Sequence, residues 1–221
     1  MLYNCLYYKF MLIATTELSV WELTLKGGWL MIPIFLLSIV GIYNLCERWL
    51  CIRKARKNNS VFWEKAIDLL DAGDYKAALK ECLANNGTLA LMLYKGIKYK
   101  DIPVADLRSM MEQEANASIA ELEKGLPLLA NVSSLAPMIG FLGTVVGMVQ
   151  AFYDMSLAGN NINIGLLSRG IYTAMVTTVA GLIVGIIALF GYNLLGAQID
   201  KIAHDMDNAC EKFIESLLNH Q

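Results

Sequence analysis

Three stretches of the chain are long, apolar and nearly free of charge, and polar or amphipathic segments separate them. The first covers residues 27–48, the second residues 125–154 and the third residues 170–197. A helix needs about 20 largely apolar residues to cross a hydrocarbon core of about 30 Å. Each stretch meets that length. The pattern therefore predicts an all-α protein with three transmembrane helices, long enough to extend into the cytoplasm.

The flanking segments differ in pattern from these spans. Residues 1–26 are mixed, and a cleaved signal peptide or an interfacial segment would fit them; the missing basic start and the poor cleavage site favour an interfacial segment. Residues 49–124 read as a helical cytoplasmic domain, and residues 155–169 as a polar loop. Residues 198–221 predict an amphipathic C-terminal helix, whose apolar face is Ile199, Ile202, Met206, Phe213 and Leu217.

Turn residues divide the predicted cytoplasmic domain into several helices. Asn59 or Ser60 is expected to cap a helix that ends near Ala72, before a turn at Gly73-Asp74. Two short helices are then expected, over residues 75–84 and 88–98. A long helix starts after residues 101–103 and leads into the second span with few interruptions.

The charges beside the first span predict its orientation. Lys and Arg concentrate in cytoplasmic loops. The flank before this span has Lys26 against Glu17 and Glu22, and residues 155–169 contain almost no positive charge. We therefore expect the N-terminus and this loop to lie outside and the C-terminus in the cytoplasm. The cluster that follows the first span is Arg48, Arg53, Lys54, Arg56 and Lys57.

Composition agrees with a membrane protein and narrows the possible chemistry. The chain is 56% hydrophobic and 17% charged, against usual values of about 45–50% and about 25%. A net charge of −2 gives no sign of nucleic-acid binding. The five cysteines form no CxxC pair, and both histidines lie near the C-terminus, so no metal site is expected. No catalytic motif is visible, so we expect neither an enzyme nor a cofactor.

Small residues recur at helical spacing in the second and third spans. Gly140, Gly143 and Gly147 share one face of the second span, and Gly181 and Gly185 share one face of the third. Small residues let membrane helices approach closely. These five glycines are therefore predicted to pack the two helices together.

Threonines accompany these glycines in residues 125–153 and 170–199, which contain no Asp, Glu, Lys, Arg or His. Thr144 lies in the glycine stripe, and Thr178 lies at a similar depth on an antiparallel helix; Thr173 and Thr177 add two hydroxyls. A threonine hydroxyl can bond back to its own helix, or it can line a polar path for water or a partner's carboxyl group. From the residues alone, both interpretations stay open.

Four stretches of the chain resemble the MotA/TolQ/ExbB proton channel family, and within it the ExbB and TolQ branch. They are residues 73–79, residues 135–147, residues 170–182 and the pair Tyr192-Asn193. The resemblance extends over about residues 27–205. The pairing of Gly143-Thr-Val with a Thr-x-x-Gly-Leu element in the next span is its most specific part.

The resemblance implies a pentamer of three-span subunits in the bacterial inner membrane. Such a pentamer surrounds an ExbD- or TolR-like partner, which spans once and carries a membrane aspartate, and proton flow energises a TonB- or TolA-like protein. The family's pore threonines fall on Thr144 and Thr178. Many relatives have glutamate where this chain has Thr173, and proline where it has Ile187. A proton path here would therefore depend more strongly on the partner's acid.

Two functions stay open at this point. One is a stator subunit of a proton-driven motor, surrounded by membrane lipids. The other is a membrane scaffold that conducts no ions, in which the glycines and threonines only pack helices. The system that such a motor would serve cannot be read from the residues.

Overall fold

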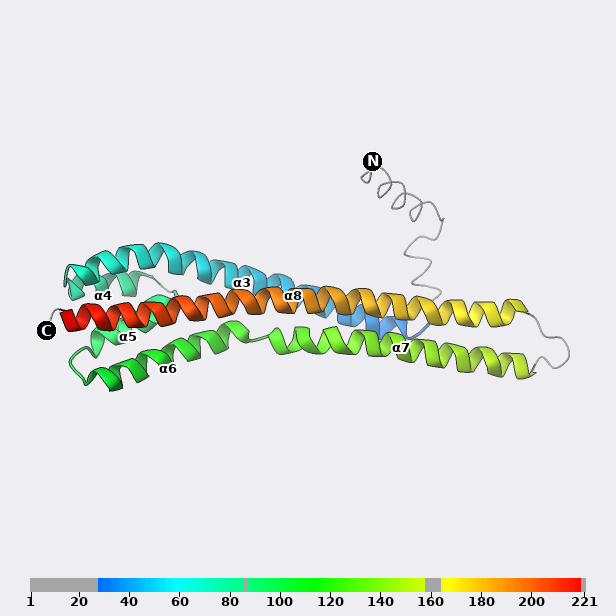
Figure 1. Cartoon of the computed structure of the whole chain (residues 1–221). Coiled ribbons are helices and arrows are strands. Elements are labelled where there is room, and N and C mark those ends of the chain that lie inside the picture. Colours follow the sequence, from blue (N-terminus) through cyan, green and yellow to red (C-terminus); the bar gives the residue numbers. More distant parts are fainter. Residues whose placement is uncertain (1–27, 86, 158–163, 220–221) are drawn as a thin grey trace, which may run out of the picture. The chain divides into compact units, whose positions relative to one another are not determined.

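The structure, a computed structural model, describes residues 28–85, 87–157 and 164–219, and these residues are helical with no strand among them (Figure 1). This confirms the predicted all-α fold. Three helical segments are long and apolar enough to cross a membrane: Met31–Arg56, Val104–Leu157 and Leu167–Asn219. The helices in chain order are α3 (Met31–Asp71), α4 (Tyr75–Ala84), α5 (Thr88–Lys98), α6 (Val104–Glu123), α7 (Leu126–Leu157) and α8 (Ile164–Asn219).

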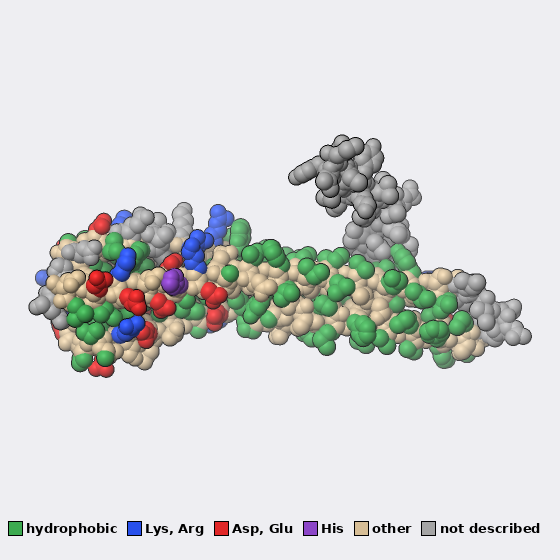
Figure 2. Space-filling view, viewed as in Figure 1, with side chains coloured by type: hydrophobic (Ala, Val, Ile, Leu, Met, Phe, Trp, Pro, Cys, Tyr) green, Lys and Arg blue, Asp and Glu red, His purple; other side chains and the backbone are tan. Residues whose placement is uncertain are grey.

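The helices contribute to two compact units. The span unit contains the described residues up to Ile39 together with Val132–Ile187. The basal unit contains Val40–Asn131 together with the described residues from Ala188 onward. Charged side chains gather over the basal unit, whereas hydrophobic side chains cover most of the visible face of the span unit (Figure 2).

Helix α3 corrects one prediction. The expected helix start at Asn59 or Ser60 is wrong, because α3 runs without a break through these residues to Asp71. No glycine or proline interrupts residues 42–72, and tertiary packing overrides the local capping tendency of Asn and Ser. The face of α3 that packs into the basal unit supplies Ile52, Phe62, Ala66 and Leu70, all buried.

The turn after α3 agrees with its prediction. Gly73 has a φ of 70°, a conformation that glycine adopts without steric cost. The N–H of Asp74 donates to the Leu69 carbonyl at 3.0 Å, which satisfies one of the last carbonyls of α3. The Asp74 carboxylate then accepts from the Ala77 N–H at 3.1 Å and caps α4. The two predicted short helices, α4 and α5, are confirmed.

The connection between α6 and α7 contains a break that the residue pattern did not predict. Helix α6 ends at Glu123, α7 begins at Leu126, and Gly125 between them has a φ of 91°. A Cβ at Gly125 would lie 2.9 Å from Asn44 Nδ2 and 3.2 Å from Arg48 Nε. Glycine is therefore required at position 125 for two reasons. The positive φ is strained for any other residue, and the two side chains of α3 leave no space for a Cβ.

The predicted loop at residues 155–169 is shorter than expected. Helix α7 continues to Leu157 and α8 begins at Ile164, so only residues 158–163 lie outside the described helices. The predicted third span and C-terminal helix are parts of one continuous helix, α8. The external location of this loop stays a prediction, and the expected interfacial segment at residues 1–26 lies outside the described residues.

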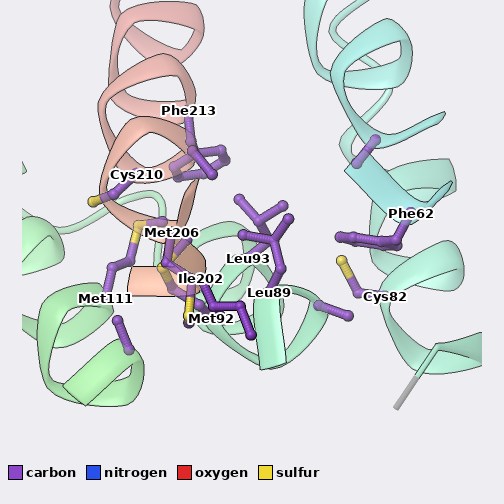
Figure 3. Close-up of a cluster of buried hydrophobic side chains, with 14 of the residues drawn as sticks. Phe62, Cys82, Leu89, Met92, Leu93, Met111, Ile202, Met206, Cys210 and Phe213 are labelled. Carbon is purple, nitrogen blue, oxygen red and sulfur yellow. The ribbon is translucent and has the colours of Figure 1, made fainter. Parts of the chain in front are cut away.

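The basal unit has a hydrophobic core built around the second half of α8 (Figure 3). The predicted apolar face of residues 198–221 is confirmed, because all five of its members are buried. A Cβ at Gly96 of α5 would lie 2.8 Å from Met111 Sδ and 3.0 Å from the Phe213 ring. Close packing of α5, α6 and α8 therefore closes this core. Burial also raises the pKa of the Cys82 thiol to about 11.

Candidate functional site

The candidate site is the line of contact between α7 and α8 within the span unit, here called the seam. Glycines bring the two backbones together along it. A Cβ at Gly140 would lie 2.9 Å from the Thr177 carbonyl oxygen and 3.1 Å from Thr178 Cα. A Cβ at Gly181 would collide with the Ala136 carbonyl oxygen and lie 3.1 Å from Gly140 Cα. Backbone therefore meets backbone at the centre of the seam.

Both ends of the seam continue this close approach. A Cβ at Gly147 would lie 2.8 Å from the Ala174 methyl group. A Cβ at Gly185 would lie 2.8 Å from Pro137 Cδ and 2.9 Å from the Ser133 carbonyl oxygen. Pro137 has no N–H, so it cannot donate to that carbonyl within α7. The glycine at 185 leaves space for α8 to approach α7 beside Pro137.

Thr177 and Thr178 hold the seam with their hydroxyl groups. The Thr178 hydroxyl donates across the seam to the Gly140 carbonyl at 2.8 Å. Thr177 is 1% exposed, and its hydroxyl donates to the Ala174 carbonyl at 2.7 Å, with the Gly140 carbonyl at 3.5 Å. A Cβ at Gly143 would collide with Thr177 Oγ1. Thr177 is thus enclosed by packing, whereas Thr178 is partly exposed.

Thr144 and Thr173 occupy different surroundings. The Thr144 hydroxyl donates to the Phe141 carbonyl of its own helix at 2.6 Å, and its side chain is partly exposed. Thr173 lies one turn before Thr177 on α8, and a Cβ at Gly28 would be 3.9 Å from Thr173 Cγ2. The structure brings Thr177 and Thr178 together at the Gly140 carbonyl, and it places Thr173 near Gly28, three residues before α3 begins.

The chemistry available in this site is that of hydroxyl groups and backbone carbonyls. Residues 126–153 and 170–199 contain no ionisable Asp, Glu, Lys, Arg or His. A threonine hydroxyl has one donor and two acceptor lone pairs. Thr144 and Thr178 each use the donor on a carbonyl, so lone pairs are what they offer to another molecule. The site can accept a hydrogen bond, but it cannot hold a proton on a carboxylate.

Two contributors to the seam were missed at the level of the sequence. The Gly140 carbonyl accepts from Thr178, but a backbone oxygen leaves no mark in the residue pattern. Gly170 contacts Ala151, because a Cβ there would lie 3.3 Å from Ala151 Cα. Its spacing of four residues from Ala174 continues the small-residue stripe of α8 and could have identified it.

Three helices of membrane-spanning length and apolar composition, with a seam of small residues, define a multi-pass membrane protein. Residues 84–208 match the model of the MotA/TolQ/ExbB proton channel family. The chain belongs to this family, and the predicted resemblance to its ExbB/TolQ branch is confirmed.

Individual relatives carry both names of that branch. The chain is 31% identical over 177 residues to an ExbB-like biopolymer transport protein of Synechocystis, covering 77% of this chain and 68% of the relative. It is 34% identical over 116 residues to the Tol-Pal system protein TolQ of Haemophilus influenzae, covering 51% and 50%. It is 27% identical over 197 residues to the biopolymer transport protein ExbB of Neisseria meningitidis, covering 84% and 89%.

Proposed function

We propose that this chain is the stator subunit of a motor driven by the proton-motive force in the bacterial inner membrane. Five copies would form a ring around the helices of an ExbD- or TolR-like partner. Proton flow between ring and partner would energise a TonB- or TolA-like protein in transport or envelope maintenance. Membership of the family and the ExbB and TolQ relatives support this proposal.

The observation that carries the proposal is a polar seam without an acid. A proton-driven device needs a group that gains and loses a proton, and residues 126–153 and 170–199, which form the seam, contain no carboxylate or histidine that could serve. Thr144 and Thr178 are nevertheless partly exposed in these segments, and each has a hydroxyl oxygen with acceptor lone pairs. These oxygens suit a carboxyl group that a partner helix brings, so the seam is half of a site.

The direction of the two hydrogen bonds gives this half-site a preference. A protonated carboxyl group can donate to the lone pairs of Thr144 and Thr178 while both keep their bonds to the Phe141 and Gly140 carbonyls. A carboxylate has no proton to donate, and it could be solvated only if a hydroxyl left its carbonyl. Burial of a charge in the membrane costs at least about 2.5–3.5 kcal/mol on insertion scales. The site therefore favours the protonated acid over the carboxylate.

Orientation and composition extend the proposal to the rest of the chain. The N-terminus and residues 155–169 would face the periplasm, and residues 49–124 and the C-terminus would lie in the cytoplasm. The cationic residues after the first span support this orientation. Thr173 in place of a family glutamate leaves the partner's acid as the carrier of the proton within the membrane.

The proposal is tested by proton uptake into proteoliposomes that contain this chain and its partner. We expect uptake with the wild type and loss of uptake with Thr144→Val or Thr178→Val, while the ring still co-purifies with its partner. Thr144→Ser and Thr178→Ser keep the hydroxyl groups and should retain uptake. Wild-type uptake in both valine variants would remove the role of these threonines.

One observation favours a second function, a membrane scaffold without ion flow. The hydroxyls of Thr177 and Thr178 are both engaged by carbonyls inside the seam, as packing alone would require. Proteoliposomes with chain and partner would then take up no protons, although the complex forms. Proton uptake by the wild type excludes this function.

A further inference from the structure

The part of α3 that follows the first apolar stretch has an exposed aromatic and cationic edge, to which the proposed function gives no binding role. The Arg53 guanidinium lies 5.3 Å from the centroid of the Trp49 ring. Trp49 is 45% exposed and Leu50 is 60% exposed. Lys54 and Arg56 are exposed beside them.

These cations have no carboxylate partner among the residues that the structure describes. The sequence contains no Asp or Glu between Arg48 and Trp63. The nearest acid before them is Glu47, whose carboxylate pairs with Arg48 at 3.1 Å. Arg53, Lys54 and Arg56 therefore present three positive charges to whatever adjoins this edge of the helix.

Apolar side chains lie on the same side of α3 at the residues that precede Arg53. Tyr43, Cys46 and Leu50 precede Arg53 at intervals of three to four residues, so they lie on the same side of α3. All three are exposed, Tyr43 at 69%. One face of the helix thus passes from apolar residues to cationic ones within about three turns, or about 15 Å.

We propose that this face binds an anionic phospholipid. The phosphate lies on Arg53, with Lys54 and Arg56 adding positive charge, because a guanidinium matches phosphate oxygens with two parallel donors. Trp49 occupies the level of the headgroup and glycerol, where tryptophan is enriched in membrane proteins. An acyl chain lies along Leu50, Cys46 and Tyr43. Both the charge and the apolar extension are needed, which selects a lipid over a free phosphate ion.

Charge sets the preference between lipids. Basic residues beside a membrane helix attract anionic headgroups by about 1 kcal/mol each near the surface. Three such residues correspond to roughly a hundredfold preference over a zwitterionic lipid, since 1.4 kcal/mol is about tenfold. Loss of the three charges should remove most of that preference and leave the contact of the acyl chain unchanged.

The test is lipid binding to the purified full-length chain by native mass spectrometry, with phosphatidylglycerol and phosphatidylcholine of the same acyl chains. We expect the wild type to retain phosphatidylglycerol with at least tenfold higher affinity. The variant Arg53→Gln/Lys54→Gln/Arg56→Gln should lose at least tenfold in affinity for phosphatidylglycerol and keep its affinity for phosphatidylcholine. Arg53→Lys, which keeps the charge but not the planar fork, should give a smaller loss.

A matched control removes the same charge elsewhere. Lys76, Lys80 and Lys201 are exposed cations on α4 and α8, and their triple glutamine variant should bind phosphatidylglycerol like the wild type. Equal losses in the two triple variants would overturn the site, as would equal binding of both lipids by the wild type. Displacement of the lipid by inorganic phosphate alone would contradict the role of the apolar extension. A change in subunit number without lipid loss would identify the face as a contact between copies.

Discussion

Replacement of Thr178 by valine removes the hydrogen bond that joins α8 to α7. The hydroxyl donates to the Gly140 carbonyl at 2.8 Å across the seam, and valine has nearly the same shape but no donor. Side-chain hydrogen bonds between membrane helices contribute about 0.6 kcal/mol on average and up to about 1.7 kcal/mol. The Gly140 carbonyl lies where backbone meets backbone, so water cannot replace the lost donor. We therefore expect a loss in the upper half of that range, about 1–1.7 kcal/mol.

Thr144→Val is the matched comparison for this loss. The Thr144 hydroxyl donates to the Phe141 carbonyl of its own helix at 2.6 Å, so its removal leaves the contact between the helices intact. Such bonds within a helix add little to its stability. We expect Thr144→Val to change the free energy of unfolding by less than about 0.5 kcal/mol. Thr178→Ser keeps the donor and should lie near the wild type.

Reversible unfolding of the purified chain in mixed micelles measures these differences, with helix content followed as the fraction of denaturing detergent rises. The order of stability should be wild type, Thr178→Ser and Thr144→Val together, and Thr178→Val below them. If Thr144→Val loses as much stability as Thr178→Val, the difference between a bond across the seam and one within a helix is refuted. In that case the two threonines contribute alike to stability, and the bond between Thr178 and the Gly140 carbonyl does not join the helices as described.

Three further predictions concern the basal unit. Gly125→Ala should destabilise the chain by about 1–3 kcal/mol in thermal unfolding, because alanine at a φ of 91° is strained and its methyl group meets Asn44 and Arg48. Gly196→Ala, inside α8 with open space around the added methyl group, should not destabilise the chain and should raise its stability by up to about 1 kcal/mol. Asp74→Ala removes the side-chain cap of α4 and should lower the free energy of unfolding by about 0.5–2 kcal/mol. Asp74→Asn keeps a side-chain oxygen that can accept the same hydrogen bond, so this variant should stay close to the wild type in stability. The contribution of Cys82 to the free energy of unfolding should be constant below pH 9 and fall between pH 9 and 11, because burial raises the pKa of its thiol from 9.0 to about 11 and the unfolded thiol ionises first; Cys82→Ala should make the fall in this range smaller, and the raised pKa of Cys210 accounts for a further part of it.

The sequence predicted what depends on periodicity. The three apolar segments, the helices α4 and α5, and the buried face of residues 198–221 all follow from residue spacing, and the structure agrees with each. Each of these features depends on residues that are close together in the sequence, or on a single apolar face of one helix. The turn at Gly73-Asp74 was predictable for the same reason, because its chemistry lies in two adjacent residues.

Other features depend on partners that the residue pattern does not reveal. The capping tendency of Asn59 and Ser60 is outweighed by burial of Phe62 and Ile52 on either side, so α3 continues. The break at Gly125 depends on side chains about 80 residues earlier in the chain. Thr178 could be identified as a polar residue, but its acceptor is a backbone oxygen of another helix. In each case the deciding contact is distant in sequence.

The close approach of α7 and α8 has a consequence for water. At Gly140 and Gly181 the seam has no room for a single methyl group, and a water molecule needs at least as much space. No file of water can therefore pass between α7 and α8 of one copy at this level. A lone subunit should be impermeable to protons in the described part of the seam. The proposed proton path would then run along a surface of this chain that another molecule completes, and conduction would be a property of assembled molecules and not of one chain.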